Sequence, residues 1–197
     1  MASPAPSRPS SLDQADWIRA ATARLASQGV EEVRVEVLAR DLGVSKGSFY
    51  WHFRDRADLL DKMLEQWEAS ESGWLDEREA RSSTATRWAK LIERSSDPAR
   101  IRTEVAVRDW ARGDEKVAVK FAIVERKRAN LIAEVLREVG FSMSAAQSWA
   151  EMVSLVRLGW MERATRDPQF QFEGRGLGEL LSDMILAASA RSSAAAH

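Results

Sequence analysis

The segment that most restricts the fold lies at residues 42–53, which read Leu-Gly-Val-Ser-Lys-Gly-Ser-Phe-Tyr-Trp-His-Phe. Gly43 can adopt the left-handed conformation that a tight turn between two helices needs, at no side-chain cost. Ser45 can cap the helix that follows, with Phe49 directed inward. Before the turn, residues 35–42 carry the inner apolar stripe of a short helix. The segment therefore predicts a helix-turn-helix.

Side chains on the first turn of the second predicted helix suit contact with DNA. That turn is the part of a recognition helix that meets base edges in the major groove. Gly47 and Ser48 are small enough to let the backbone come close, and Lys46 can donate to a guanine edge or to a phosphate. DNA binding is the leading hypothesis.

The charge of this region argues less strongly for nucleic acid. Residues 1–68 hold nine lysines and arginines against eleven aspartates and glutamates. Residues 34–56 hold five basic and three acidic side chains, so a positive patch can lie on one face. We expect affinity to rest on few phosphate contacts and on a dimer that engages two half-sites.

The composition excludes several classes of protein. The chain of 197 residues has no cysteine and only His52 and His197, which excludes disulfides and disfavours metal sites. It has no apolar run near the roughly 18 residues of a membrane span and no signal-peptide core. We expect a soluble cytoplasmic protein without a cofactor.

Helical periodicity continues along the rest of the chain, and no long stretch alternates as a strand does. Ser11 and Gln14 match a capping box that opens a first helix, which Gly29 ends. Asp55 can cap a fourth helix that reaches about residue 67. Further helices are expected at about 82–95, 98–112, 114–140, from a capping box at Ser144 and Gln147 to about 166, and around 180–185, with glycines 174, 176 and 178 in a loop.

This pattern predicts an all-α chain in two parts. A flexible arm covers residues 1–10, and a three-helix helix-turn-helix head with its connecting helix covers 11–68. A larger C-terminal helical domain for ligand binding and dimerisation covers 69–190, and a flexible tail covers 191–197. The head is of the usual size for a small domain.

Residues 11 to about 67 resemble the DNA-binding head of the tetracycline-repressor (TetR) family. The resemblance rests on a first helix ending at Gly29, on Leu38-Ala39, on Gly43-Val44-Ser45, on the run 50–53 and on Leu59-Leu60. The later helices resemble the family's regulatory domain far less specifically. The resemblance implies an all-α regulator that binds DNA.

The resemblance also implies a set of DNA contacts. Tyr50 and His52 can donate to phosphate oxygens. Arg56 stands where the family usually has lysine, and Arg34 replaces a capping hydroxyl and can gain a phosphate contact. Glu36 can accept from a cytosine amino group, or it can be repelled by phosphate and stay uninvolved. The expected DNA-binding residues are Arg34, Ser45, Lys46, Gly47, Ser48, Tyr50, Trp51, His52 and Arg56.

Tryptophans are the second notable feature, because most lie outside the head. Pockets for apolar ligands are lined by aromatic residues and form between helices in bundles. The alternative for each tryptophan is plain core packing. We expect a small, largely apolar effector to bind a pocket on the helices that enclose the family's cavity, lined by Trp88, Trp110, Phe121, Trp149 and Met152.

The last two helices carry apolar stripes that suit a homodimer interface, which the family builds as a four-helix bundle. The alternative is packing within the chain. A two-fold dimer would match a palindromic operator in double-stranded DNA. The expected interface residues are Val153, Val156, Trp160, Leu180, Leu181, Met184, Ile185 and Ala188.

Three functions were weighed. The favoured one is a ligand-responsive regulator, most simply a repressor that an effector releases from its operator. The alternative is a helical partner-binding or architectural protein that has lost specific DNA binding, which the negative head supports. We expect no enzyme, because the sequence offers no cysteine nucleophile, no histidine pair and no glycine-rich phosphate loop.

Overall fold

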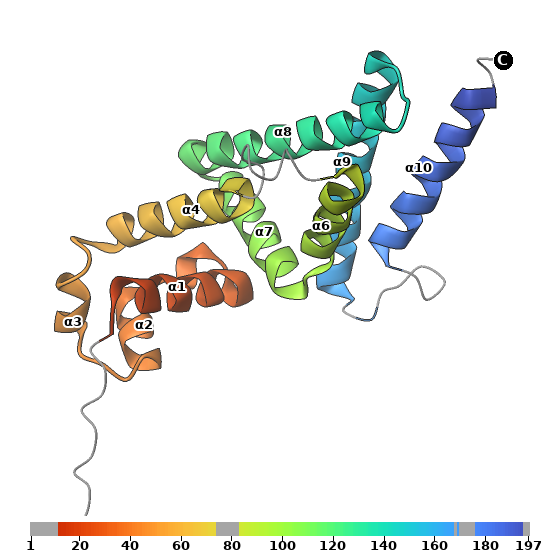
Figure 1. Cartoon of the computed structure of the whole chain (residues 1–197). Coiled ribbons are helices and arrows are strands. Elements are labelled where there is room, and N and C mark those ends of the chain that lie inside the picture. Colours follow the sequence, from red (N-terminus) through yellow and green to blue (C-terminus); the bar gives the residue numbers. More distant parts are fainter. Residues whose placement is uncertain (1–11, 74–82, 168, 170–175, 195–197) are drawn as a thin grey trace, which may run out of the picture.

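A computed structural model describes residues 12–73, 83–167, 169 and 176–194. Over these residues the chain is all-α, as predicted. The head is built from α1 (Gln14–Gln28), the 3-10 turn η1 (Val30–Glu32), α2 (Val35–Asp41) and α3 (Lys46–Tyr50). The helix α4 (Arg56–Ser72) leads from the head to a bundle of α6 (Thr84–Ser96), α7 (Pro98–Ala111), α8 (Glu115–Glu138), α9 (Met143–Arg166) and α10 (Leu177–Ala194), as Figure 1 shows.

Aromatic packing holds the three short helices of the head together. Phe49 is fully buried at the centre of this core. Its ring meets Trp17 edge-on at 5.3 Å between centroids and stacks on Phe53 at 5.2 Å. Such ring pairs add to the free energy of burial. The inward position predicted for Phe49 is therefore confirmed.

Local capping explains where most helices begin. Asp55 caps α4 by accepting from the backbone of Asp58, and Asp97 caps α7, in which Pro98 fills the first turn. The cap of α1 is Asp13, which forms a capping box with Asp16. The predicted box of Ser11 and Gln14 is thus wrong, since Gln14 is already helical; Ser11 lies outside the described residues.

The C-terminal part differs from the prediction at three places. Ser142 caps α9 in place of Ser144, which lies inside the helix. Gly178 belongs to α10 and not to a loop, and an added Cβ there would meet the side chain of Ile92 on α6 at 2.0 Å. The helix α10 also continues to Ala194, past the predicted start of the tail at Arg191. Gly174 lies outside the described residues.

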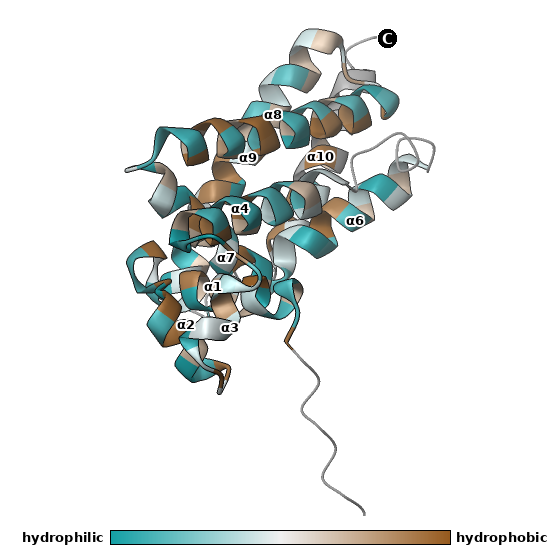
Figure 2. Cartoon of the chain, turned by 90° about the vertical axis from the view of Figure 1, so that its left-hand side faces the viewer, coloured by the Kyte–Doolittle hydropathy of each residue, from teal (hydrophilic) through white to brown (hydrophobic). Residues whose placement is uncertain are grey.

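Two apolar clusters make up the core. The first joins the head to α4, α7 and α8, where Trp67 stacks on Phe121 with ring centroids 5.9 Å apart. The second joins α6, α8, α9 and α10. Figure 2 shows that the helices carry both hydrophilic and hydrophobic residues, as expected of amphipathic helices around a core. Along the described ranges, no helix is long and apolar enough to cross a membrane.

The turn before α3 provides a test of this account. Gly43 has a φ of +68°, a left-handed conformation that costs other residues about 1–2 kcal/mol. We expect Gly43→Ala to lower the free energy of unfolding by that amount in urea denaturation. Gly113→Ala is the matched control, because that glycine has ordinary φ and open space around its Cβ position. Equal stability of the two variants would contradict the assigned turn.

Candidate nucleic-acid interface

The short helix α3 turns one face to the core and the other to solvent. Phe49 and Phe53 are buried, whereas the neighbouring Tyr50 and Trp51 are 62% and 88% exposed. Exposing two large aromatic side chains side by side is unfavourable in water, so it points to a surface that meets something else. Among the other expected contacts, Ser45, Lys46 and Gly47 are exposed at the start of α3, and Ser48 and His52 are half-buried.

Ser45 occupies the N-cap position of α3, as predicted. Within the described head, however, its side chain makes no capping hydrogen bond. The Ser45 hydroxyl is thus not used to hold the helix. At the exit of α3, Gln14 Nε2 donates to the carbonyl oxygen of His52 at 3.1 Å, which ties the start of α1 to this surface. The contact holds the end of α3 against α1.

The basic side chains of this face are paired with acids. Lys46 Nζ lies 2.8 Å from Glu36 Oε1, and Arg34 Nη2 lies 2.6 Å from Glu32 Oε2. The hydrogen bond from Lys46 is the main reason that the pKa of Glu36 lies below its ordinary value, so the carboxylate is ionised at neutral pH. Lys46 and Arg34 are thus each paired with an acid of the same head.

Arg56 has a different place from the expected one. Its Nε donates to the carbonyl of Val33 and its Nη2 to the carbonyl of Val30, both at 2.6 Å. The guanidinium thus fastens the segment between α1 and α2 to the start of α4, and these bonds compete with a phosphate contact. Arg54, which is not among the expected DNA-binding residues, is an exposed cation of the same turn, 3.7 Å from Asp58. Its position directly after the buried Phe53 is the sequence feature that indicates its exposure.

The residues expected to line an effector pocket do not come together. Trp110 and Phe121 pack against the first apolar cluster, and Trp88 and Trp149 pack against the second. Met152 is exposed on α9. Of these five, Trp110 lines a cavity of about 510 Å³ between the end of α1 and α7, together with Leu25, Val30 and Arg102. Phe121, Trp88 and Trp149 follow the alternative interpretation, core packing, more closely, whereas Met152 belongs to neither cluster.

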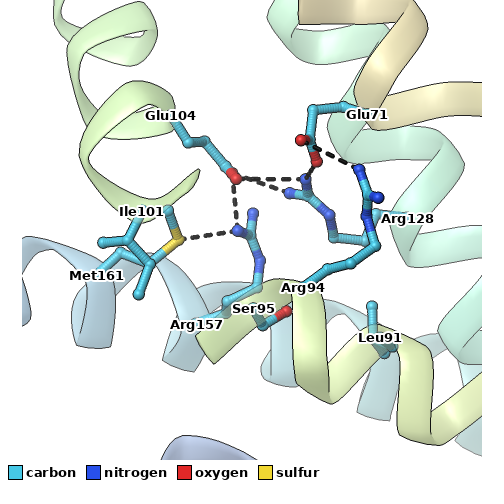
Figure 3. A pocket seen from close by; sticks show the side chains of 9 residues that line it. All are labelled: Glu71, Leu91, Arg94, Ser95, Ile101, Glu104, Arg128, Arg157 and Met161. Carbon is cyan, nitrogen blue, oxygen red and sulfur yellow. Dashed lines mark hydrogen bonds and ion pairs between the residues drawn. The ribbon is translucent and has the colours of Figure 1, made fainter. Parts of the chain in front are cut away.

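The centre of the bundle holds charged side chains instead, shown in Figure 3. Glu71, Glu104, Arg128 and Arg157 are all buried, and they come from α4, α7, α8 and α9. Arg128 donates to Glu104 at 2.9 Å and to Glu71 at 3.2 Å, and Arg157 donates to Glu104 at 2.7 Å. We call these four residues the buried charge network.

Further side chains extend the network outward. Arg100 donates to Glu71 at 2.7 Å, and Arg94 lies 3.3 Å from the same carboxylate. Glu125 accepts from both Arg128 and Arg157. The cavity among these groups measures about 10 Å³, which is room for about one water molecule. The space among these charged groups is therefore too small for an organic ligand.

Opposite charges stabilise each other in this network despite burial. Burial works against the charged form of Glu104, but the neighbouring Arg128 and Arg157 outweigh it and lower the pKa of that carboxyl. Burial likewise works against the charged form of Arg128, while Glu104, Glu125 and Glu71 raise its pKa. Both shifts favour the charged forms of Glu104 and Arg128, and removing one member of the network leaves a buried charge without compensation.

The residues expected at a dimer interface differ in how far they are buried. Val153, Leu181 and Ile185 are buried inside the second cluster of their own chain, which is the alternative of packing within the chain. Trp160 and Leu180 are half-buried, and Val156 is exposed. The side chains of Met184 and Ala188 lie outside the described residues. Next to Val156 on α9, Leu155 and Met152 are also exposed, so a stripe on α9 remains open.

The fold and this surface define a class. The head is a helix-turn-helix with an exposed aromatic face at α3. The long helix α4 joins it to an all-helical bundle. Such heads are the modules that place a short helix in the major groove of DNA. No group of three or more histidine, cysteine, aspartate or glutamate residues in the described part is placed to hold a metal ion.

Comparisons agree with this class. Residues 18–63 match the model of the bacterial regulatory proteins of the tetR family. Over 47 residues the chain is 40% identical to the HTH-type transcriptional regulator AcrR of Shigella flexneri, which covers 24% of this chain and 20% of AcrR. The chain therefore spans a fifth of the length of that curated relative.

Solved structures extend the likeness to the whole fold. A transcriptional regulator from Rhodococcus sp. Rha1 is similar with a TM-score of 0.69 at 20% identity, over 88% of this chain and 94% of that one. The SmeT–triclosan complex is similar with a TM-score of 0.66 at 21% identity, over 89% and 90% of the two chains. SmeT comes from Stenotrophomonas maltophilia. Residues 18–63 thus match the segment that the tetR-family model describes, and the fold of the chain is similar to that of these solved regulators.

The buried charge network predicts a large loss of stability on removal of one carboxylate. We expect Glu104→Gln to lower the free energy of unfolding by about 3–5 kcal/mol at pH 7, because Arg128 and Arg157 lose the more buried of the two carboxylates that they share. The matched control is Glu134→Gln, which removes an exposed carboxylate 3.8 Å from Arg87 and should cost less than about 1 kcal/mol.

The comparison of wild type with Glu104→Gln also gives a pH test. The pKa of Glu104 is lower in the folded than in the unfolded chain, so its contribution is complete above the unfolded value of about 4.3 and is lost at lower pH. The stability difference between wild type and Glu104→Gln should therefore shrink as the pH falls below about 4.3. A difference that stays constant down to pH 3 would contradict the ion pairs.

Proposed function

We propose that this protein is a sequence-specific transcription regulator that binds a palindromic DNA operator as a homodimer, most simply as a repressor. The observation that carries the proposal is the outer face of α3, where Tyr50 and Trp51 are exposed beside Lys46 while Phe49 fixes the helix from within. A phenol can donate to phosphate, and an exposed indole can contact thymine methyl groups.

The pairing of the cations supports a dimer. Because Lys46 and Arg34 each already hold an acid, one head gains little from bulk charge. Two heads that bind half-sites about 34–36 Å apart, or a multiple of that, would add their contacts. The exposed stripe of Met152, Leu155 and Val156 on α9 is the best candidate for the contact between subunits, since exposed apolar stripes mark interfaces.

A response to a small molecule completes the proposal. The cavity of about 510 Å³ beside Trp110 is large enough for a small ligand, and its apolar residues Leu25, Val30 and Val105 suit a largely apolar one. A ligand there would touch both the head, through α1, and the bundle, through α7. SmeT, the repressor of the multidrug efflux pump SmeDEF, has a similar fold and has been solved in complex with triclosan. We extend this ligand response to the present chain by analogy.

Selection of DNA from a random pool tests the proposal. Recovery of one palindrome supports a regulator. Recovery of no sequence would instead favour a helical partner-binding or architectural protein, for which the excess of acids in residues 1–68 is the best argument.

The aromatic face predicts a uniform effect on affinity. We expect Tyr50→Ala to weaken binding to all sequences roughly tenfold, because it removes a phosphate contact without base specificity. Fluorescence anisotropy at fixed salt measures this. Met143→Ala removes an equally exposed apolar side chain at the start of α9 and serves as the control. Equal affinity of Tyr50→Ala and wild type would argue against the assigned face.

The stripe on α9 predicts the oligomeric state. Leu155 is 68% exposed in the single chain, and a carboxylate there would be buried without a partner in a dimer. We expect Leu155→Glu to give a monomeric mass by light scattering at micromolar concentration, where wild type gives a dimer. Val119→Glu, at another exposed apolar position on α8, should stay dimeric. If Leu155→Glu is still a dimer, the interface does not lie on this stripe of α9.

A further inference from the structure

We propose that Glu36 and Lys46 act as one unit that reads a single G·C base pair in the major groove, with Lys46 on the guanine and Glu36 on the cytosine. The inference rests on the proposed function and gives it a chemical specificity. It makes Glu36, an acid on a DNA-facing surface, a determinant of the operator sequence.

Geometry ties the two side chains together. Lys46 is the first residue of α3, the position of a recognition helix that meets base edges. Glu36 is the second residue of α2, and its Oε1 lies 2.8 Å from Lys46 Nζ. Both side chains are more than half exposed, at 60% for Glu36 and 58% for Lys46. If a base atom accepts a hydrogen bond from Nζ, a neighbouring donor of the same base pair is therefore within reach of the Glu36 carboxylate.

The spacing of this pair matches one edge of a base pair. Guanine presents the acceptors O6 and N7, and cytosine presents the donor N4. Guanine O6 and cytosine N4 are hydrogen-bonded to each other, so they lie about 3 Å apart. The ammonium and carboxylate of the protein, 2.8 Å apart, present the complementary donor and acceptor at the same spacing.

Charge explains why an acid can enter the groove here. A lone carboxylate would be repelled by the phosphates. Lys46 neutralises it locally, and the hydrogen bond from Lys46 keeps Glu36 ionised, so that it accepts hydrogen bonds and does not donate them. Such a group suits cytosine N4 and opposes a thymine or guanine oxygen at the same place.

The choice of G·C over T·A follows from the number of acceptors. A T·A pair also presents an acceptor, O4, beside a donor, N6. It offers the lysine one acceptor and a methyl group, whereas guanine offers two acceptors. The pair is therefore expected to prefer G·C, with T·A as the second choice at that position.

The test compares the base preferences of wild type, Glu36→Gln and Glu32→Gln by selection from a random DNA pool followed by sequencing. Glu32→Gln is the matched control, because it removes an equal charge from another exposed ion pair of the same head, that with Arg34. We expect Glu36→Gln to keep the palindrome but to lose at least about fivefold of the preference for cytosine at one position of each half-site. Glu32→Gln should raise affinity for all sequences and keep every base preference.

A third variant tests whether Lys46 reads the same base pair. Lys46→Met should weaken the preference for G·C at the same position of the half-site that Glu36→Gln alters. If Glu36→Gln raises affinity uniformly and keeps the wild-type preferences, Glu36 only shields Lys46 and the inference is overturned. If wild type selects no sequence, the proposed function itself fails, so the two failures are distinguishable.

Discussion

The ion pairs of Glu71 and Glu104 with Arg128 and Arg157 are the interaction on which the arrangement of the bundle depends. Charges taken out of water are costly unless each one keeps a partner. Four helices supply these charges. None of the helices can therefore shift far without leaving one of the buried charges unpaired in an apolar environment. The apolar clusters supply most of the driving force for folding, while the network fixes how the helices meet.

This constraint reaches the head through α4. One end of that helix is held by Arg56, which donates to the carbonyls of Val30 and Val33. The other end carries Glu71, which three arginines on α6, α7 and α8 contact. Directional bonds at its two ends thus tie α4 to the head on one side and to the bundle on the other.

Local signals made much of the fold predictable from the sequence. Gly43, Asp55 and Pro98 act within a few residues of their own position, and the structure places them as expected. The network was not predictable in this way, because Glu71 and Arg128 are 57 positions apart and each alone resembles a solvated charge. The tryptophans were misleading for the same reason, since helical spacing gives a residue's face but not which neighbour covers it. The exposed face of α3 follows from its motif, because the turn at Gly43 and the buried Phe49 orient the helix locally.

The ion pairs on the surface of the head have a consequence for how such a protein would be distributed in a cell. Phosphate contacts determine how strongly a regulator is retained on the many unrelated sites of a genome. Because Lys46 and Arg34 already hold Glu36 and Glu32, those sites would retain little of it. If the protein acts as proposed, few copies would then suffice to occupy an operator, and the free pool would exchange quickly after release.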